Sequence, residues 1–147
     1  MSKRQIVALL ALLGLLIAIY LTLYKTGAIA ELVCSVGSCE TVQMSRWATF
    51  LGLPVAAWGI VFYVALLGVA LSGLQGSLAD SRAVSVALVA VTGWGVLFSA
   101  WLTYLELFVI HAICQWCVVS AILVAIAFVI AWLDLREHSV GETAVSA

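Results

Sequence analysis

Four long apolar runs, separated by short polar segments, constrain the fold of this chain more than any other feature. They cover residues 6–24, 54–72, 83–105 and 111–133. A helix needs about 20 apolar residues to cross the hydrocarbon core of a bilayer, and each run has roughly that length. Because 66% of the 147 residues are hydrophobic and only 9% are charged, a soluble fold would expose a large apolar surface. The sequence therefore predicts an all-α integral membrane four-helix bundle, with residues 1–147 forming a single transmembrane domain.

The first run could instead belong to a cleaved signal peptide, because Lys3 and Arg4 precede it. It is, however, longer than the usual apolar region of about 7–15 residues, and no convincing small-residue cleavage site occurs before Lys25. Retention as a membrane span is therefore favoured. The net charge of -1, without a basic tract, excludes nucleic acid as a partner.

Basic residues near the spans indicate the orientation. If the N-terminus is cytoplasmic, four basic residues lie inside and two outside: Lys3, Arg4, Arg82 and Arg136 against Lys25 and Arg46. The positive-inside rule prefers this arrangement, which makes both termini cytoplasmic. The outer loop 25–53 and the short turn 106–110 then face outward, and every cysteine lies on or near that face.

The outer loop is long enough to contain structure of its own. Residues 40–50 could form a short interfacial helix, with one face toward lipid (Val42, Trp47, Phe50) and one toward water (Glu40, Gln43, Arg46). Gly37 and the nearby serines predict a mobile turn before this helix. A mobile loop above a fixed helix end suits a shuttle of reducing equivalents.

Two pairs of cysteines provide the candidate chemistry. Cys114 and Cys117 form a C-x-x-C about one turn into the fourth predicted span, a spacing that places two sulfurs on one helical face. Cys34 and Cys39 close a small loop that can form and break a disulfide without disturbing a core. Thiol-disulfide exchange could pass an electron pair from one dithiol to the other.

Each pair alone also has a simpler interpretation. Helical cysteines are often buried small hydrophobic residues, and Cys34 with Cys39 could be a structural disulfide. A four-thiolate zinc site is disfavoured, because one pair is embedded in a membrane helix rather than in a polar knuckle. Taken together on one membrane face, the four cysteines favour redox chemistry.

The same residues, in this order, resemble the vitamin K epoxide reductase family, most closely its bacterial and archaeal quinone-linked members. The resemblance extends from the first span to the fourth and rests on one set of motifs: Cys34, Cys39, Ser45-Arg46-Trp47-Ala48-Thr49, Gly52-Leu53-Pro54, Gly59 and Cys114-Gln115-Trp116-Cys117. It implies that Cys114 and Cys117 are the active-site pair and that the Cys117 thiolate faces a quinone of the ubiquinone or menaquinone type. It also implies that Cys39 exchanges with Cys114, and that Cys34 meets the thiol of a thioredoxin-fold partner. Ser45 matches the family's serine or threonine, which would hydrogen-bond the quinone or the nearby thiolate.

Two departures from the family pattern refine this expectation. Animal members carry an asparagine four residues before the glycine that matches Gly59, whereas this chain has Val55, which disfavours vitamin K epoxide as the substrate. Many bacterial members carry a thioredoxin-like domain after the bundle. This sequence ends at Ala147, about a dozen residues after the last predicted span, so a separate DsbA-like protein is the expected partner.

Three further residues are candidates for the quinone site. His111, one turn before Cys114, could favour its thiolate or pass a proton, although an interfacial histidine needs no such role. Glu106 could act similarly, or could simply end a helix near the headgroups. Trp58 could line the quinone pocket or anchor the bundle at the interface.

The predicted function is a quinone-dependent thiol-disulfide oxidoreductase that drives disulfide formation in a thioredoxin-fold protein. One alternative is a quinone or vitamin K epoxide reductase that uses thiols as its reductant. Another is a non-catalytic membrane protein whose loop is held by a structural disulfide.

Overall fold

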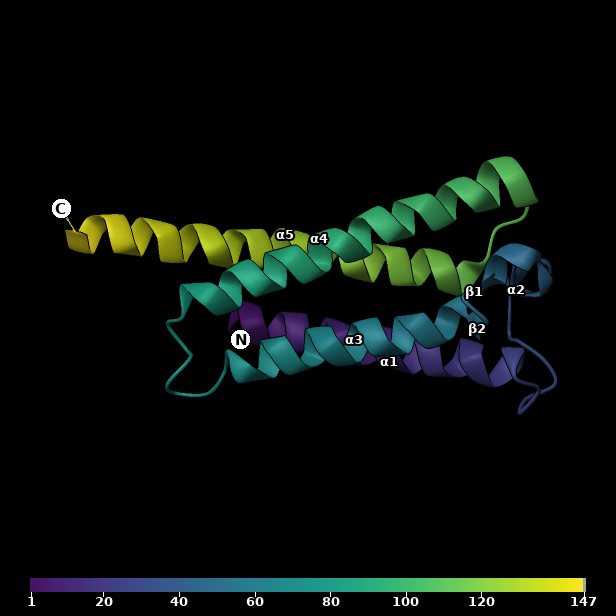
Figure 1. Ribbon diagram of the computed structural model, residues 1–147, viewed down its shortest axis with the longest axis horizontal. Helices are drawn as coiled ribbons and strands as arrows, with labels where there is room; N and C mark the ends of the chain where they lie inside the picture. Colours follow the sequence, from purple (N-terminus) through teal and green to yellow (C-terminus); the bar gives the residue numbers. More distant parts are fainter. Residues whose placement is uncertain (147) are drawn as a thin grey trace.

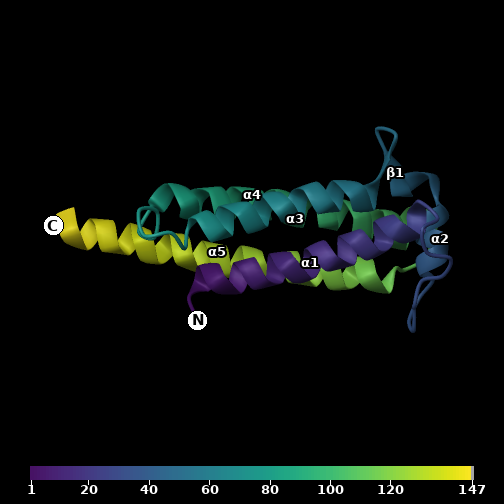
Figure 2. The ribbon, with the colours of Figure 1, turned by 90° about the horizontal axis from the view of Figure 1, so that it is seen from below.

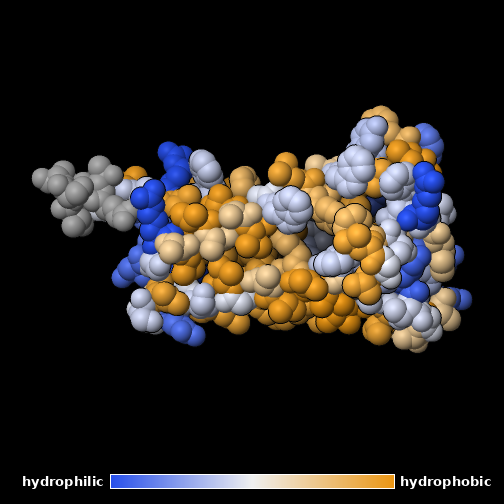
Figure 3. Space-filling view, viewed as in Figure 1, coloured by the Kyte–Doolittle hydropathy of each residue, from blue (hydrophilic) through white to orange (hydrophobic). Residues whose placement is uncertain are grey.

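Four long helices lie side by side in the computed structural model, which describes residues 1–146 and the side chains of residues 1–141 (Figures 1 and 2). They are α1 (Lys3–Lys25), α3 (Val55–Ser72), α4 (Arg82–Tyr104) and α5 (Gln115–Ser146). Helices α1 and α4 each pack against both α3 and α5. All four have the length and apolar composition of membrane spans. Figure 3 shows the resulting apolar belt between two hydrophilic ends, which confirms the predicted all-α membrane bundle.

The helix starts follow local sequence signals. Ser2 caps α1 in a capping box with Gln5, satisfying backbone N–H groups that the first turn leaves free. Helix α3 begins directly after Pro54, whose fixed backbone angle suits that position. The first two helices therefore lie close to the predicted 6–24 and 54–72.

Helix α4 matches the third predicted span, 83–105, to within one residue at each end, but the turn after it and the fourth span differ from the prediction. Helix α4 continues into a π-helix, η2 (Leu105–Ile110), where the sequence predicted an outer turn. His111 then adopts a left-handed backbone conformation, with φ of 58°, and α5 begins at Gln115 rather than at residue 111. Cys114 consequently lies just before the helix, not one turn inside it.

The loop between α1 and α3, predicted to lie outside, contains two short helices and a hairpin. They are α2 (Cys39–Met44), η1 (Arg46–Ala48), and the paired strands β1 (Thr49–Phe50) and β2 (Leu53–Pro54). A single helix over residues 40–50 is therefore incorrect, because the extended backbone of Ser45 interrupts it. Gln43 and Val42, expected to face water and lipid respectively, are both buried.

A buried arginine ties the helices together at the end that holds both termini, opposite α2 (Figures 1 and 2). The Arg4 guanidinium, on α1, pairs with Asp134 of α5 at 3.2 Å and donates to Ser85 of α4 at 3.1 Å. It also donates to the carbonyl oxygens of Gly73, Leu78, Ala79 and Ser81, between α3 and α4. Because its partners come from every part of the bundle end, this charge is buried without being left unpaired.

Candidate active site

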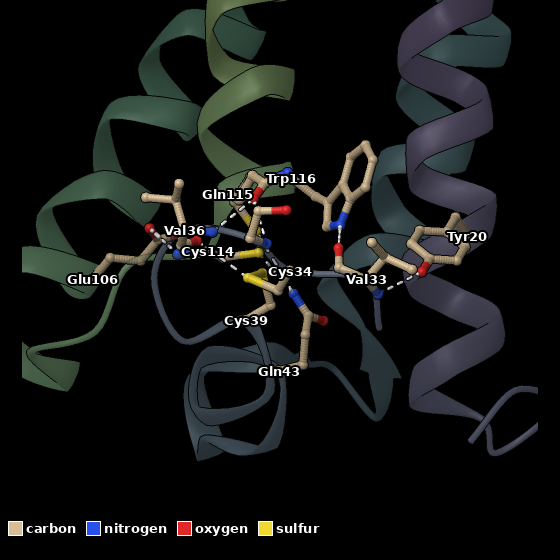
Figure 4. The surroundings of a disulfide bond; sticks show 12 residues. Tyr20, Val33, Cys34, Val36, Cys39, Gln43, Glu106, Cys114, Gln115 and Trp116 are labelled. Atoms are coloured by element: carbon tan, nitrogen blue, oxygen red, sulfur yellow. Dashed lines mark hydrogen bonds between the residues drawn. A yellow bond between two sulfur atoms is a disulfide. The ribbon is translucent and has the colours of Figure 1, made fainter. Parts of the chain in front are cut away.

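The four cysteines converge in one cluster at the α2 end of the bundle, although the two pairs are far apart in the sequence. Figure 4 shows three of them, Cys34, Cys39 and Cys114. Cys39, the first residue of α2, is 1% exposed, and Cys114 is fully buried in the same apolar cluster. Cys34 and Cys117 are partly buried and pack against that cluster. The fold therefore brings together the two dithiols that the sequence predicted as a relay.

The two pairs differ in oxidation state. Cys34 and Cys39 form a disulfide, with their Cα atoms 6.2 Å apart. Cys114 and Cys117 are free thiols. The structure therefore shows an oxidised loop pair beside a reduced C-x-x-C pair.

The cysteine loop is docked on the segment that leads into α5. Gly37 forms an antiparallel bridge with Cys114, and the Ser38 N–H donates to the carbonyl oxygen of Ile113 at 2.8 Å. Gly37 has φ of 85°, a conformation that strongly favours glycine. The turn expected to be mobile is thus held by backbone hydrogen bonds next to Cys114.

The two residues between Cys114 and Cys117 also hold the loop. The Gln115 side-chain oxygen accepts hydrogen bonds from the N–H groups of Ser35 at 2.9 Å and Val36 at 3.0 Å. The Trp116 indole N–H donates to the carbonyl oxygen of Val33 at 2.7 Å. The x-x residues of the C-x-x-C therefore position one dithiol against the other.

Cys114 occupies the N-terminal edge of α5. Its carbonyl oxygen accepts the first helical hydrogen bond, from the N–H of Val118 at 3.0 Å, which places Cys117 in the first turn. A hydrogen bond from the Cys117 thiol lowers the pKa of Cys114 to about 7, against the opposing effect of burial. The Gln43 amide acts in the same direction as Cys117. Near neutral pH, Cys114 is therefore the more readily ionised of the two C-x-x-C thiols.

Gln43 is a functional candidate that the sequence analysis assigned to the wrong face. Its side-chain N–H group lies 3.8 Å from the sulfur of Cys114 and 3.6 Å from that of Cys117. Its own backbone oxygen accepts from the Lys25 ammonium at 2.7 Å. The available signal was its spacing, since a residue four positions after Cys39 lies on the same helical face.

An apolar cavity of about 710 Å³ adjoins Cys117 inside the bundle. Its walls come mainly from α3, α4 and the loop between α1 and α3, with a smaller share from α5, and its few polar groups include Gln43, Ser45 and Glu106. This size and character are typical of sites for small organic ligands. Of the four cysteines, Cys117 is the one that lines the cavity, while Cys114 lies under the loop.

A sequence model of the vitamin K epoxide reductase family matches residues 5–132, which include all four cysteines and the cavity-lining parts of every long helix. The chain belongs to this family. Membership identifies it as an oxidoreductase, and the four apolar helices make it a multi-pass membrane protein.

The other residues that the resemblance to the vitamin K epoxide reductase family singled out lie in different places. Ser45 and Trp58 both line the cavity. The Ser45 hydroxyl donates to the carbonyl oxygen of Val42 at 2.8 Å, and the Trp58 indole donates to that of Phe50 at 2.9 Å. His111 is exposed and does not line the cavity. The roles of all three in this family member stay predictions.

The ionisation of Cys114 provides a test of the Gln43 contact. With the loop disulfide intact, thiolate absorbance should rise with a first midpoint near pH 7, whereas an ordinary cysteine titrates near pH 8.5. Gln43→Leu should raise that midpoint, because the thiolate loses an N–H donor. Thr41→Val, an exposed position on the same helix, should leave it unchanged. A first midpoint that does not move in Gln43→Leu would contradict this assignment.

Proposed function

We propose that this protein is a quinone-dependent thiol-disulfide oxidoreductase that drives disulfide formation in a separate thioredoxin-fold partner outside the cytoplasm. One observation carries the proposal: the C-x-x-C pair has one sulfur, Cys117, at an apolar cavity and the other, Cys114, beneath the loop disulfide. A pair placed in this way can exchange with the loop on one side and with a cavity ligand on the other.

The outer step begins at the more accessible loop sulfur. Cys34 is partly exposed, whereas Cys39 is 1% exposed, so a partner thiolate would attack Cys34 and release Cys39. The second partner thiol then displaces Cys34. The partner gains one disulfide, and the loop pair gains two electrons and two protons.

The inner step transfers these electrons to the C-x-x-C pair in its oxidised form. The Cys39 thiolate attacks Cys114, Cys117 leaves, and Cys34 then displaces Cys114 from Cys39. Exchange proceeds faster when the leaving sulfur has a low pKa, and Cys114 has a pKa of about 7. The products are a loop disulfide and a reduced C-x-x-C, which is the combination in the structure.

The cavity has the properties that a quinone requires. Its apolar walls suit a ring and a prenyl tail, while Ser45, Gln43 and Glu106 supply polar groups near Cys117. A bound quinone would supply a two-electron, two-proton acceptor. Cys117 would face the acceptor, and Ser45 and Trp58 would help to hold it.

We assign the cysteine end to the outer side of the membrane because more basic residues flank the spans at the opposite end. The N-terminus and the far end of α5, which extends beyond it, both lie on that opposite side (Figure 2), so both would be cytoplasmic. A thioredoxin-fold partner would then approach α2 from outside.

A second candidate function is the reduction of a quinone or a quinone epoxide with thiols as the reductant. The family's name favours it. Val55 lines the cavity here, so this position offers no side-chain amide for an epoxide. Comparing turnover of an epoxide with that of the parent quinone, using one reductant, distinguishes the two.

The proposed function can be tested with the purified protein in lipid vesicles, a reduced thioredoxin-fold protein and a soluble ubiquinone analogue. Partner disulfide and reduced quinone should form in equal amounts. In the double variant Cys114→Ser with Cys117→Ser, formation of both products should fall to the uncatalysed background. The electron pair from the partner can then no longer reach the cavity. Met44→Ser, which removes an exposed sulfur from α2, should retain activity. Intact turnover in the double variant would refute the relay. A Cys34–Cys39 disulfide with a reduction potential below about -300 mV would support a structural role instead.

A further inference from the structure

A buried carboxyl group lies at the junction of the C-x-x-C and the cavity. Glu106 is 4% exposed, although it sits at the outer end of an apolar span, and it lines the cavity together with Cys117. Burying a carboxyl group in such a place is costly, and ionisable residues inside membrane spans commonly serve a function.

Glu106 contacts both cysteines of the C-x-x-C pair, Cys114 and Cys117. One carboxyl oxygen accepts the backbone N–H of Cys114 at 3.2 Å (Figure 4). The Cys117 side chain also hydrogen-bonds to this carboxyl group. Among the residues that the structure describes, the side chain of Glu106 interacts with Cys114 and Cys117 and forms no ion pair.

The local backbone explains how Glu106 reaches this position. It lies in the first turn of η2, the π-helical extension of α4. Its carbonyl oxygen also accepts the N–H of Ala112, so both ends of the residue hold the chain that returns to α5. Single π-helical turns within longer helices are frequently found at functional sites.

We propose that Glu106 accepts the proton of the Cys117 thiol and passes it to the cavity ligand when the C-x-x-C pair is oxidised. The proposal rests on the proposed function, because it requires an acceptor of electrons and protons in the cavity. It assigns Glu106 a direct role at a reacting atom, whereas Gln43 stabilises the thiolates by donating an N–H group.

The step balances with a quinone as the acceptor. Two sulfur-bound protons and two electrons leave Cys114 and Cys117 as their disulfide forms, and two O–H bonds form on the quinone. Glu106 carries the proton of Cys117 and ends in its starting state. The second proton comes from Cys114, or from water where Cys114 is already ionised.

Glu106→Gln separates this role from a structural one. Glutamine retains an oxygen that can accept the Cys114 N–H but cannot carry the proton. Starting from the state in the structure, single-turnover quinone reduction should be slowed by about 10²–10⁴-fold, the usual contribution of general acid-base catalysis. Glu106→Asp should restore part of the rate. Glu40→Gln, which removes an exposed carboxylate from α2, should leave it unchanged.

A second measurement uses the protein without quinone. Electron exchange between the loop pair and the C-x-x-C pair should stay within a few fold of wild type in Glu106→Gln, since that step needs no proton transfer to the cavity. Equal slowing of exchange and quinone reduction would show a structural role and overturn the proposal. Wild-type rates for both reactions would also overturn it. If the variant does not fold, wild-type single turnover decides: slower quinone reduction in heavy water supports the relay, and equal rates overturn it. Failure of the wild-type protein itself to reduce quinone would instead refute the proposed function.

Discussion

Replacing Cys34 by serine is expected to stop oxidation of the protein partner and to trap a disulfide between Cys39 and Cys114. Cys39 can still attack Cys114 of an oxidised C-x-x-C pair, because both sulfurs lie in one buried cluster. The variant lacks the second loop thiol that would release Cys114 from the mixed disulfide. Partner turnover should fall to background, and mass spectrometry of non-reduced peptides should detect the Cys39–Cys114 link.

The matched control removes both loop cysteines. Cys34→Ser with Cys39→Ser should leave the C-x-x-C pair free to reduce quinone with a small dithiol as reductant, at a rate within a few fold of wild type. Oxidation of the protein partner should still be lost. Partner oxidation that persists in this double variant would show that electrons enter at Cys114 or Cys117 directly.

Gly37→Ala is expected to separate the two dithiols without changing a sulfur. A Cβ at Gly37 would collide with the carbonyl oxygen of Ile113, in the segment against which the loop is docked. The positive φ of Gly37 adds a conformational cost of about 1–2 kcal/mol for any other residue. Displacement of the loop by about 1 Å should slow exchange between the pairs by about 100-fold.

Gly27→Ala isolates the effect of the collision. Gly27 also has φ of 85°, but a Cβ there would meet nothing within 4 Å. Both variants therefore place alanine at the same positive φ, and Gly37→Ala alone disturbs the docking. Exchange can be followed by rapid acid quenching and alkylation of free thiols. Equal rates in the two variants would show that docking next to Cys114 does not limit exchange.

The sequence predicted the membrane bundle well because its signal is simple. Apolar runs of the right length leave few alternatives in a bilayer, where backbone groups must be satisfied within each helix. The boundary between α4 and α5 was less predictable, because residues 107–113 are apolar apart from His111 and contain no glycine or proline. The end of η2 depends instead on the left-handed His111 and on the contact between Gly37 and Cys114.

The pairing of the cysteines with a cavity was only partly predictable. Spacing indicated two dithiols on one face, and family resemblance supplied their order. Gln43 was predicted to face water because only lipid and water were considered as surroundings of the short helix. In the structure, a third environment, the C-x-x-C thiols, covers the face of α2 that carries Cys39 and Gln43. Contacts of this kind depend on tertiary packing and leave no local pattern.

The contrast between the exposed and buried cysteines has a consequence for a compartment that contains small thiols. Cys39 and Cys114 are almost inaccessible, so a glutathione-sized molecule cannot reach the sulfurs between which the inner exchange occurs. Within the loop pair, direct attack by such thiols would be confined to Cys34, where a folded partner can compete by docking. Burial would thus shield the proposed exchange between Cys39 and Cys114, and disulfides formed by such a relay would depend on which proteins can dock rather than on the ambient thiol pool.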